Sequence, residues 1–385
     1  MLEKLRYLTA GESHGKGLLG IIDGIPANLE ISEEYIRAQL SRRQKGHGRS
    51  NRMKIESDFA ELYCGVRQGK TNGGPIGLII ENKDYKNWSE CMSVEKNNYS
   101  KKVTLPRPGH ADLAGVMKFG FDDIRDVIER SSARETAMRV ALSSICRKIL
   151  EDLNIELCSR VIQIHNVSDD SKIDFSKSLA KLNDMIDKSD VRCLNKDAEI
   201  KMIDAINIAK KDGDSVGGII EIYCSGLPFG IGSYTQWDKK LQSKISESLL
   251  SINAFKGIEF GMGFNAASTL GSNVHDEIAK DDENLKRKTN NAGGIEGGMS
   301  NTEPLVIRLS MKPIPTLTKP LGSVDIESNT PSKAHRERTD SCAVPAASII
   351  AENLLCIVVA DALLSKFGGD SMDQLKKHIH QSGKF

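Results

Sequence analysis

Short runs of apolar residues, several of them alternating with polar ones, recur along the chain and are separated by glycine-rich turns. This pattern is typical of β-strands, and tight turns between neighbouring runs favour antiparallel pairing. The clearest alternation, Leu305, Ile307, Leu309 and Met311, predicts a half-buried strand. The strands predicted in this way cover 5–10, 18–22, 60–66, 76–80, 157–165, 219–224, 255–260 and 305–311.

In other segments, apolar residues repeat every three or four positions, as they do on one face of a helix. Ser32 is a typical N-cap for a helix that carries Ile36 and Leu40 on one face. A long amphipathic helix is predicted over 133–153, and a nearly all-apolar core helix over 346–364. Further helices are predicted over 198–211 and 241–249.

Strands, hairpin turns and helices alternate without regular βαβ units, and this order predicts an α+β fold with antiparallel sheets. The charged, glycine-rich turns are spread from residue 11 to residue 342, so we expect a single large domain over 1–385. The stretch 166–196 is rich in Ser, Asp and Lys and has little aromatic content. We predict an inserted surface excursion there.

The charge balance gives no global attraction to nucleic acid or membranes, because 53 basic and 52 acidic residues leave a net charge of +1. Any affinity for anions must therefore be local. The N-terminal residues lack the apolar centre of a secretory signal, and polar residues interrupt the apolar run 349–364, so we expect a cytoplasmic protein. Eight scattered cysteines without a C-x-x-C pair indicate reduced thiols, and widely separated histidines argue against a metal site.

The most unusual stretch is 107–136, which combines four arginines with His110 after a Pro-Gly turn. Arginine grips carboxylate or phosphate in a fixed, bidentate geometry, and a histidine among arginines can move a proton within an anion site. We predict that the turn holds His110 at the start of a helix, and that Arg130 and Arg134 lie at the N-terminal end of the helix over 133–153. A solvated helix whose acidic residues pair with the arginines is the alternative interpretation.

Four other turns present chemically active side chains. The turn between the first two predicted strands exposes Ser13 and His14 beside glycines. The stretch 42–54 carries six cations spaced by glycines, as expected for a loop over an anion, a solvated loop or a nucleic-acid patch. Glycine pairs in 290–300 and the charged cluster 334–342 complete the set. Without a G-x-x-x-x-G-K-[ST] motif, these residues indicate an enzyme or binder for a small polyanion rather than a nucleoside-triphosphate enzyme.

Four motifs occur in the order expected of one family. They are Gly11-Glu12-Ser13-His14-Gly15, Arg107-Pro108-Gly109-His110-Ala111-Asp112, Glu129-Arg130-Ser131-Ser132-Ala133-Arg134-Glu135-Thr136 and Arg338-Thr339-Asp340. With them the chain resembles chorismate synthase from Arg6 to about Phe367. The resemblance implies a shikimate-pathway lyase that removes phosphate and a ring hydrogen from 5-enolpyruvylshikimate 3-phosphate by anti-1,4-elimination, giving chorismate. It also implies reduced FMN without net redox change, a sandwich of antiparallel β-sheets flanked by helices, and a homotetramer.

By motif match, the resemblance assigns His14 to protonating the departing phosphate, His110 to the reduced flavin, and Asp340 to a proton relay near flavin N5. Substrate and FMN together bring two phosphates and two carboxylates, which calls for many arginines. The implied cofactor-binding residues are Arg43, Arg49, Arg130, Ser131, Ser132, Asn253, Ala254, Gly297, Lys312, Pro313, Ile314, Pro315, Thr316 and Arg338. The implied substrate-binding residues are Ser13, His14, Arg49, Arg107, Arg134 and Arg338.

Two departures from the family pattern point to a sub-branch. Asp126-Val127-Ile128-Glu129 replaces a triple glycine of some members, and Thr339 stands where some carry histidine. The sequence leaves open whether NADPH or an outside reductant reduces the FMN, whether the loop 42–54 is closed without ligand, and what His47 does. Two rival functions remain, a non-catalytic binder of phosphorylated ligands or RNA and an oxidoreductase that uses the same flavin.

Overall fold

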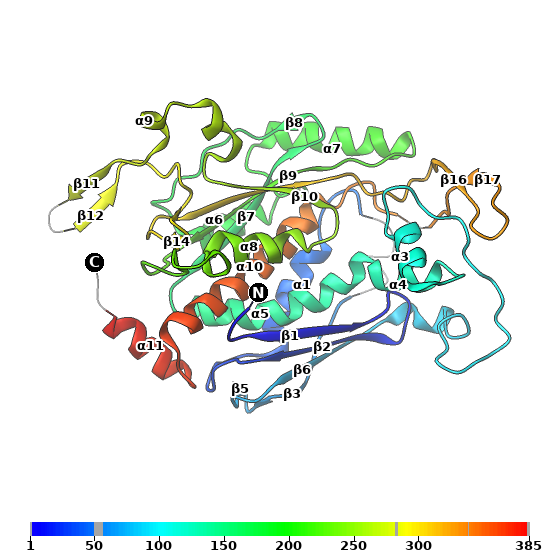
Figure 1. Ribbon diagram of the computed structural model, residues 1–385, viewed down its shortest axis with the longest axis horizontal. Helices are drawn as coiled ribbons and strands as arrows, with labels where there is room; N and C mark the ends of the chain where they lie inside the picture. Colours follow the sequence, from blue (N-terminus) through cyan, green and yellow to red (C-terminus); the bar gives the residue numbers. More distant parts are fainter. Residues whose placement is uncertain (1, 50–56, 282–283, 338, 383–385) are drawn as a thin grey trace.

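The molecule is built on two antiparallel sheets with a layer of helices between them (Figure 1). A computed structural model describes residues 2–49, 57–281, 284–337 and 339–382. The first sheet has the strand order β1-β2-β6-β3 and consists of β1 (Arg6–Gly11), β2 (Gly17–Asp23), β6 (Ile76–Glu81) and β3 (Glu61–Cys64). The second has the order β10-β15-β9-β7-β8 and consists of β10 (Phe255–Phe260), β15 (Leu305–Met311), β9 (Gly218–Ser225), β7 (Glu156–Ile164) and β8 (Val167–Ser168).

Helices fill the space between the two sheets (Figure 1). The helix α5 (Thr136–Asp152) packs against β2, where Gly20 permits close approach, because a Cβ atom there would lie 2.5 Å from the Met138 sulfur. The helix α10 (Val344–Phe367) packs against α5 on one side and against β7 and β9 on the other. Around it lie α1 (Glu33–Gln44) and α8 (Leu241–Leu250). The main hydrophobic cluster thus occupies the layer between the sheets, and a smaller one joins the other face of the second sheet to 179–186.

The predicted core helix is confirmed as α10, and its buried Ser348, Glu352 and Asp361 have partners inside the fold. By length and composition α10 could cross a membrane, but its most apolar stretch is wholly buried in the fold. Glu352 is fully buried, and Arg42, Arg147 and Arg192 surround its carboxylate. Burial alone would raise the pKa of Glu352, but the three guanidinium groups outweigh burial and hold that pKa well below its usual range.

The segment 166–196 differs from the predicted surface excursion. It contributes β8 to the second sheet and α6 (Leu179–Ile186), which packs on β7. Arg192 is 5 % exposed and donates from Nη2 to the main-chain oxygen of Ser159 on β7 at 2.7 Å. Polar residues such as Lys172, Asp174 and Lys181 are exposed, as the composition suggested, but Asn183 and Arg192 join the buried cluster around Glu352.

The predicted α+β class and antiparallel sheets are confirmed, and most element positions agree within a few residues. Two predicted elements are divided. Gly65, with φ +84°, ends β3 and separates it from β4. The helix predicted over 133–153 begins as α5 only at Thr136, because extended Ser132 and the short 3-10 helix η2 (Ala133–Glu135) separate it from α4 (Arg125–Ser131).

The remaining elements are short hairpins and peripheral helices. The hairpins pair β4 (Val66–Arg67) with β5 (Lys70–Thr71), β11 (Ile278–Asp281) with β12 (Asn284–Arg287), β13 (Ile295–Glu296) with β14 (Met299–Ser300), and β16 (Gly322–Val324) with β17 (Pro331–Lys333). The helices are α3 (Asp112–Phe119), α7 (Lys196–Lys211), α9 (Gly271–Val274), α11 (Met372–Gln381), and the 3-10 helices η1 (Lys83–Asn87), η3 (Trp237–Lys239) and η4 (Gly263–Ser268).

Candidate active site

A chamber of about 560 Å³ brings together turns that are far apart in the sequence. Its walls come from the β1–β2 turn, the end of α1, the turn before α3, the α4–α5 junction, the ends of β10 and β15, and the start of α10. Sixteen of the predicted site residues line it: Ser13, His14, Arg43, Arg49, Arg107, His110, Ser131, Ser132, Arg134, Asn253, Ala254, Lys312, Ile314, Pro315, Thr316 and Asp340.

Asp58 holds two of the chamber's arginines close together, although the like charges repel. The Asp58 carboxylate accepts from Arg134 Nη1 and lies 3.4 Å from Arg43 Nη1. Arg43 also donates from Nη2 to Thr136 Oγ1 at 2.9 Å, and Arg134 donates from Nε to Asn82 Oδ1 at 2.9 Å. Burial lowers the pKa of Arg43 to about 10, which still leaves it charged near neutral pH. The two guanidinium groups therefore form a fixed cationic wall.

His110 has its predicted position at the start of a helix. Gly109, with φ +77°, turns the chain just before α3 and directs His110 toward the chamber. The Nδ1 atom of His110 lies 2.5 Å from Asp112 Oδ1 and 3.0 Å from Arg107 Nη2. Burial would raise the pKa of Asp112, but hydrogen bonds from His110 and Arg107 outweigh it and keep the pKa below its usual range.

The described part of the basic loop lies against the segment that precedes α10. Arg49 Nη1 is 2.9 Å from Asp340 Oδ2, and the main-chain oxygen of Gly48 accepts from the Ser341 amide at 2.9 Å. His47, whose role the sequence left open, lies 2.8 Å from Asn207 Oδ1 through Nε2, and its amide donates to the Asp190 oxygen. His47 therefore anchors the loop to α7. Residues 50–56, with Arg52 and Lys54, lie outside the described residues.

An apolar wall faces these charges. It includes Ile350 and several alanines of α10 together with Met311 and Ile314 at the end of β15. The turn at Ala254, with φ +70°, is held in place because Asn253 Nδ2 donates to the Ser131 oxygen at 2.9 Å. A chamber with one apolar wall and one cationic wall fits a flat ring system that carries a phosphate, such as FMN.

Three predicted residues do not line the chamber. Arg130 turns away and donates to the main-chain oxygens of Thr9 and Gly11, which ties α4 to the end of β1. Gly297 lies in the turn between β13 and β14, and Pro313 is the one residue of its motif outside the lining. Arg338 lies outside the described residues, so its predicted role is not placed.

Several residues that shape the chamber were not predicted from the sequence. They are the carboxylates that pair with its cationic side chains, and Trp88. Two of these carboxylates lie next to predicted site residues in the sequence: Asp112 follows His110 by two residues, and Glu129 precedes Arg130. Trp88 belongs to none of the motifs, yet its ring stacks on His14. Glu337 lies within the charged cluster 334–342, although its partner Arg125 is far away in the sequence. Asp58 had no local signal, because its partners Arg43 and Arg134 are 15 and 76 positions away.

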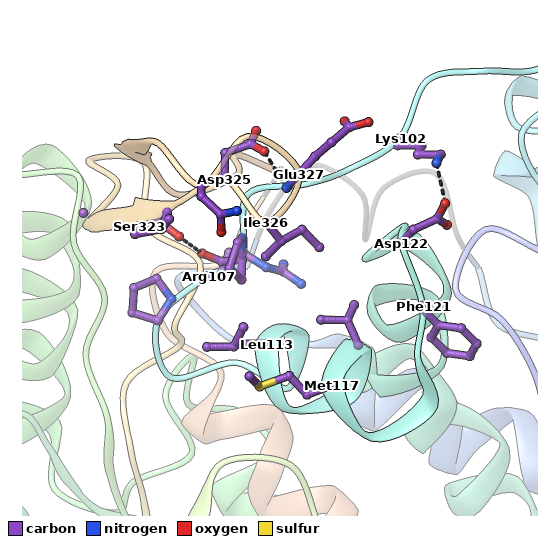
Figure 2. A pocket seen from close by; sticks show the side chains of 16 residues that line it. Lys102, Arg107, Leu113, Met117, Phe121, Asp122, Ser323, Asp325, Ile326 and Glu327 are labelled. Atoms are coloured by element: carbon purple, nitrogen blue, oxygen red, sulfur yellow. Dashed lines mark hydrogen bonds and ion pairs between the residues drawn. The ribbon is translucent and has the colours of Figure 1, made fainter.

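A second hollow, of about 790 Å³, lies between α3 and the loop that joins β16 to β17 (Figure 2). Leu113 and Met117 on α3 and Ile326 across from them give it an apolar interior (Figure 2). Asp122, Asp325 and Glu327 add negative charge, and Lys102 is paired with Asp122 (Figure 2). Among its described lining residues, only Lys102 and Arg107 bring positive charge to this hollow, whereas four arginines and two histidines line the chamber, so the chamber remains the candidate site for a polyanion.

Fold and chamber together define an α+β protein that can bind a small polyanion and move protons beside it. A model of the chorismate synthase family matches residues 5–364. The chorismate synthase of Listeria welshimeri is 52 % identical over 382 residues, which cover 98 % of each chain. That of Geobacillus thermodenitrificans is 50 % identical over 386 residues, which cover 99 % of each. A solved structure titled "Crystal Structure of Chorismate Synthase" matches 99 % of this chain and 98 % of its own with a TM-score of 0.81 and 38 % identity. The chain belongs to the chorismate synthase family.

Proposed function

We propose that this protein is the lyase that eliminates phosphate and a ring hydrogen from 5-enolpyruvylshikimate 3-phosphate to give chorismate, and that the chamber is its active site. Family membership supports the reaction. The observation that supports the location is the convergence of two histidines and four arginines on one cavity, in a chain of net charge +1. The four arginines are Arg43, Arg49, Arg107 and Arg134.

The chamber residues also support a role for reduced FMN. Bound there, reduced FMN would supply the electron density that eases phosphate departure and an acceptor for the ring hydrogen. We propose that Ala254, Ile314 and Pro315 contact its apolar ring system, while Arg49 and Lys312 supply positive charge for its phosphate. Burial and neighbouring Lys256 lower the pKa of Lys312, so an anion between the two lysines would relieve their repulsion.

The proposed proton chemistry uses three side chains of the chamber. His14 donates a proton to the departing phosphate, because phosphate leaves poorly as a full dianion. His110 holds a proton against the flavin, with Asp112 fixing its ring. Asp340, ion-paired with Arg49, passes the abstracted proton toward solvent. The substrate anions are gripped by Arg107 and Arg134, which are nearly buried and already held in place by carboxylates.

An anaerobic assay tests this function. Purified protein receives chemically reduced FMN and 5-enolpyruvylshikimate 3-phosphate, and phosphate release and chorismate absorbance are followed with and without NADPH. Equal amounts of both products from reduced FMN alone are expected. A need for NADPH only when oxidised FMN is supplied would establish an intrinsic flavin reductase. Failure to form either product would reject the proposed activity.

We also propose that the protein is a cytoplasmic, single-domain homotetramer that works without nucleic acid or a membrane. The support is an uncovered apolar face on the first sheet. Paired residues Leu8 and Ile21 are 73 % and 53 % exposed, and Leu19 on the same face is 51 % exposed, whereas Leu18 and Ile22 on the opposite face are buried. Light scattering should give four times the mass of one chain, and Leu19→Lys should reduce it. A monomer would reject the tetramer.

A further inference from the structure

Glu129 grips the turn that carries His14 at three points. Its main-chain oxygen accepts from the Ser13 amide at 3.1 Å, and its carboxylate accepts from the His14 amide at 2.7 Å. The same carboxylate lies 2.9 Å from His14 Nδ1 through Oε1 and 3.1 Å through Oε2. The Glu129 side chain is 0 % exposed, so water does not compete for these bonds.

The face of the His14 ring is also in contact with other side chains. Trp88 stacks on it with ring centroids 4.0 Å apart and an interplanar angle of 24°. Arg125 lies over the Trp88 ring at 5.1 Å and donates from Nη1 to Glu129 Oε1 at 3.2 Å. Arg125 is also paired with Glu337 at 2.7 Å. Carboxylate, indole and guanidinium thus leave the imidazole little freedom to turn.

A carboxylate on one ring nitrogen decides which nitrogen can exchange a proton. Nδ1 bonded to Glu129 stays protonated whether the ring is neutral or charged, so a proton enters or leaves through Nε2. His14 lines the chamber, and Nε2 is the ring nitrogen that Glu129 does not contact. We propose that Glu129 is the positioning residue for His14: it fixes the tautomer and direction of the ring, while Trp88 clamps the ring face. This inference rests on the proposed function, in which His14 protonates the departing phosphate.

If Glu129 only stabilised the fold, its loss would have different effects from the loss of a positioning residue. As a buried ion pair with Arg125, Glu129 would affect folding and every property of the chamber alike. As a positioning residue, it acts only through His14, so its loss should lower kcat while leaving the substrate KM and FMN affinity nearly unchanged. It should also have no further effect once His14 is gone.

The test uses four variants of the full chain in the anaerobic assay: Glu129→Gln, Trp88→Ala, His14→Ala, and Glu129→Gln combined with His14→Ala. We expect Glu129→Gln to lower kcat at least about tenfold, toward the roughly 10⁴-fold loss seen when a serine protease loses its orienting carboxylate. KM and FMN affinity should stay within about twofold, and the double variant should match His14→Ala. Glu135→Gln is the matched control, because Glu135 is buried nearby but pairs with Arg139, and its kcat should equal that of the unaltered protein.

The outcomes separate this inference from the proposed function. An unaltered protein that forms no chorismate rejects the function itself. An active protein whose kcat is unaffected by Glu129→Gln, or whose Glu129 and His14 losses multiply in the double variant, overturns the positioning role. If Glu129→Gln does not fold, half-exposed Trp88 provides the same test. Trp88→Ala should lower kcat in the presence of His14. A fifth variant, Trp88→Ala combined with His14→Ala, should have the same kcat as His14→Ala, and any other result contradicts the proposal.

Discussion

His110 and Asp112 are joined by a 2.5 Å contact between Nδ1 and Oδ1, at the point where the Pro-Gly turn runs into α3. Asp112 is completely buried and also binds Arg107 through Nε at 2.8 Å. One carboxylate thus sets the direction of both side chains, for which we proposed proton transfer and anion binding. Because Asp112 contacts Nδ1, we expect that in the proposed mechanism His110, like His14, exchanges its proton through Nε2.

The first prediction concerns His110 itself. His110→Ala should leave FMN binding nearly intact and lower turnover roughly a hundredfold or more, as expected for loss of a proton-transfer group. Flavin fluorescence titration and the anaerobic assay measure the two effects. His378→Ala is the control, since that histidine lies on α11 and contacts the Phe367 oxygen. Near-normal turnover of His110→Ala would remove His110 from the mechanism.

Arg134 should contribute to substrate affinity through the shape of its guanidinium group. Asp58 and Asn82 hold the Arg134 guanidinium group in place. Arg134→Lys keeps the positive charge but loses the planar, forked set of N–H donors that can bind an anion at two points. We expect the KM for 5-enolpyruvylshikimate 3-phosphate to rise roughly tenfold or more, as for loss of a charged hydrogen bond. Arg139→Lys, on α5 and paired with Glu135, should leave KM unchanged. An unaltered KM in Arg134→Lys would contradict this assignment.

Glu337 predicts a pH dependence of stability. Burial would raise its pKa, but hydrogen bonds from His335 and Arg125 and the charge of Arg107 lower the pKa to about 2 from 4.5. A lowered folded-state pKa means that the stabilisation is complete above about pH 4.5 and is lost as the pH falls toward 2. Glu337→Gln should therefore lower the melting temperature at pH 7, and the gap to the unaltered protein should narrow as the pH falls to 3. A gap that stays constant with pH would show that the lowered pKa does not contribute.

The buried cluster around Glu352 predicts a large stability effect far from the chamber. Glu352→Gln leaves Arg42, Arg147 and Arg192 without their shared counter-charge. Breaking a buried pair in this way costs about 3–5 kcal/mol of unfolding free energy. Glu34→Gln is the control, because its pairing with Arg37 is exposed and should be worth at most about 1 kcal/mol. Urea unfolding measures both, and equal small effects would show that the cluster is not needed for stability.

Secondary-structure elements and turns were predicted correctly where the local periodicity and composition of the sequence determine them. The alternation over 305–311 matches β15 residue for residue, because a half-buried strand must place every second side chain on the core face. The apolar run of α10 could be accommodated only in the core. The turn at Gly109 needed a positive φ, which glycine adopts without strain, and this fixed the position of His110 before α3. These features depend on neighbours a few residues away.

Tertiary structure alone decided which charges meet. Glu129 and His14 are 115 positions apart, and Arg43 and Arg134 share an aspartate for which no motif gave a signal. The same packing turned Arg130 away from the chamber and drew Arg192 into the core. The sequence shows which side chains are charged, but the packing of strands and helices determines which distant residues they contact. The sequence therefore determined the groups available for chemistry, and only the fold determined how carboxylates hold and aim them.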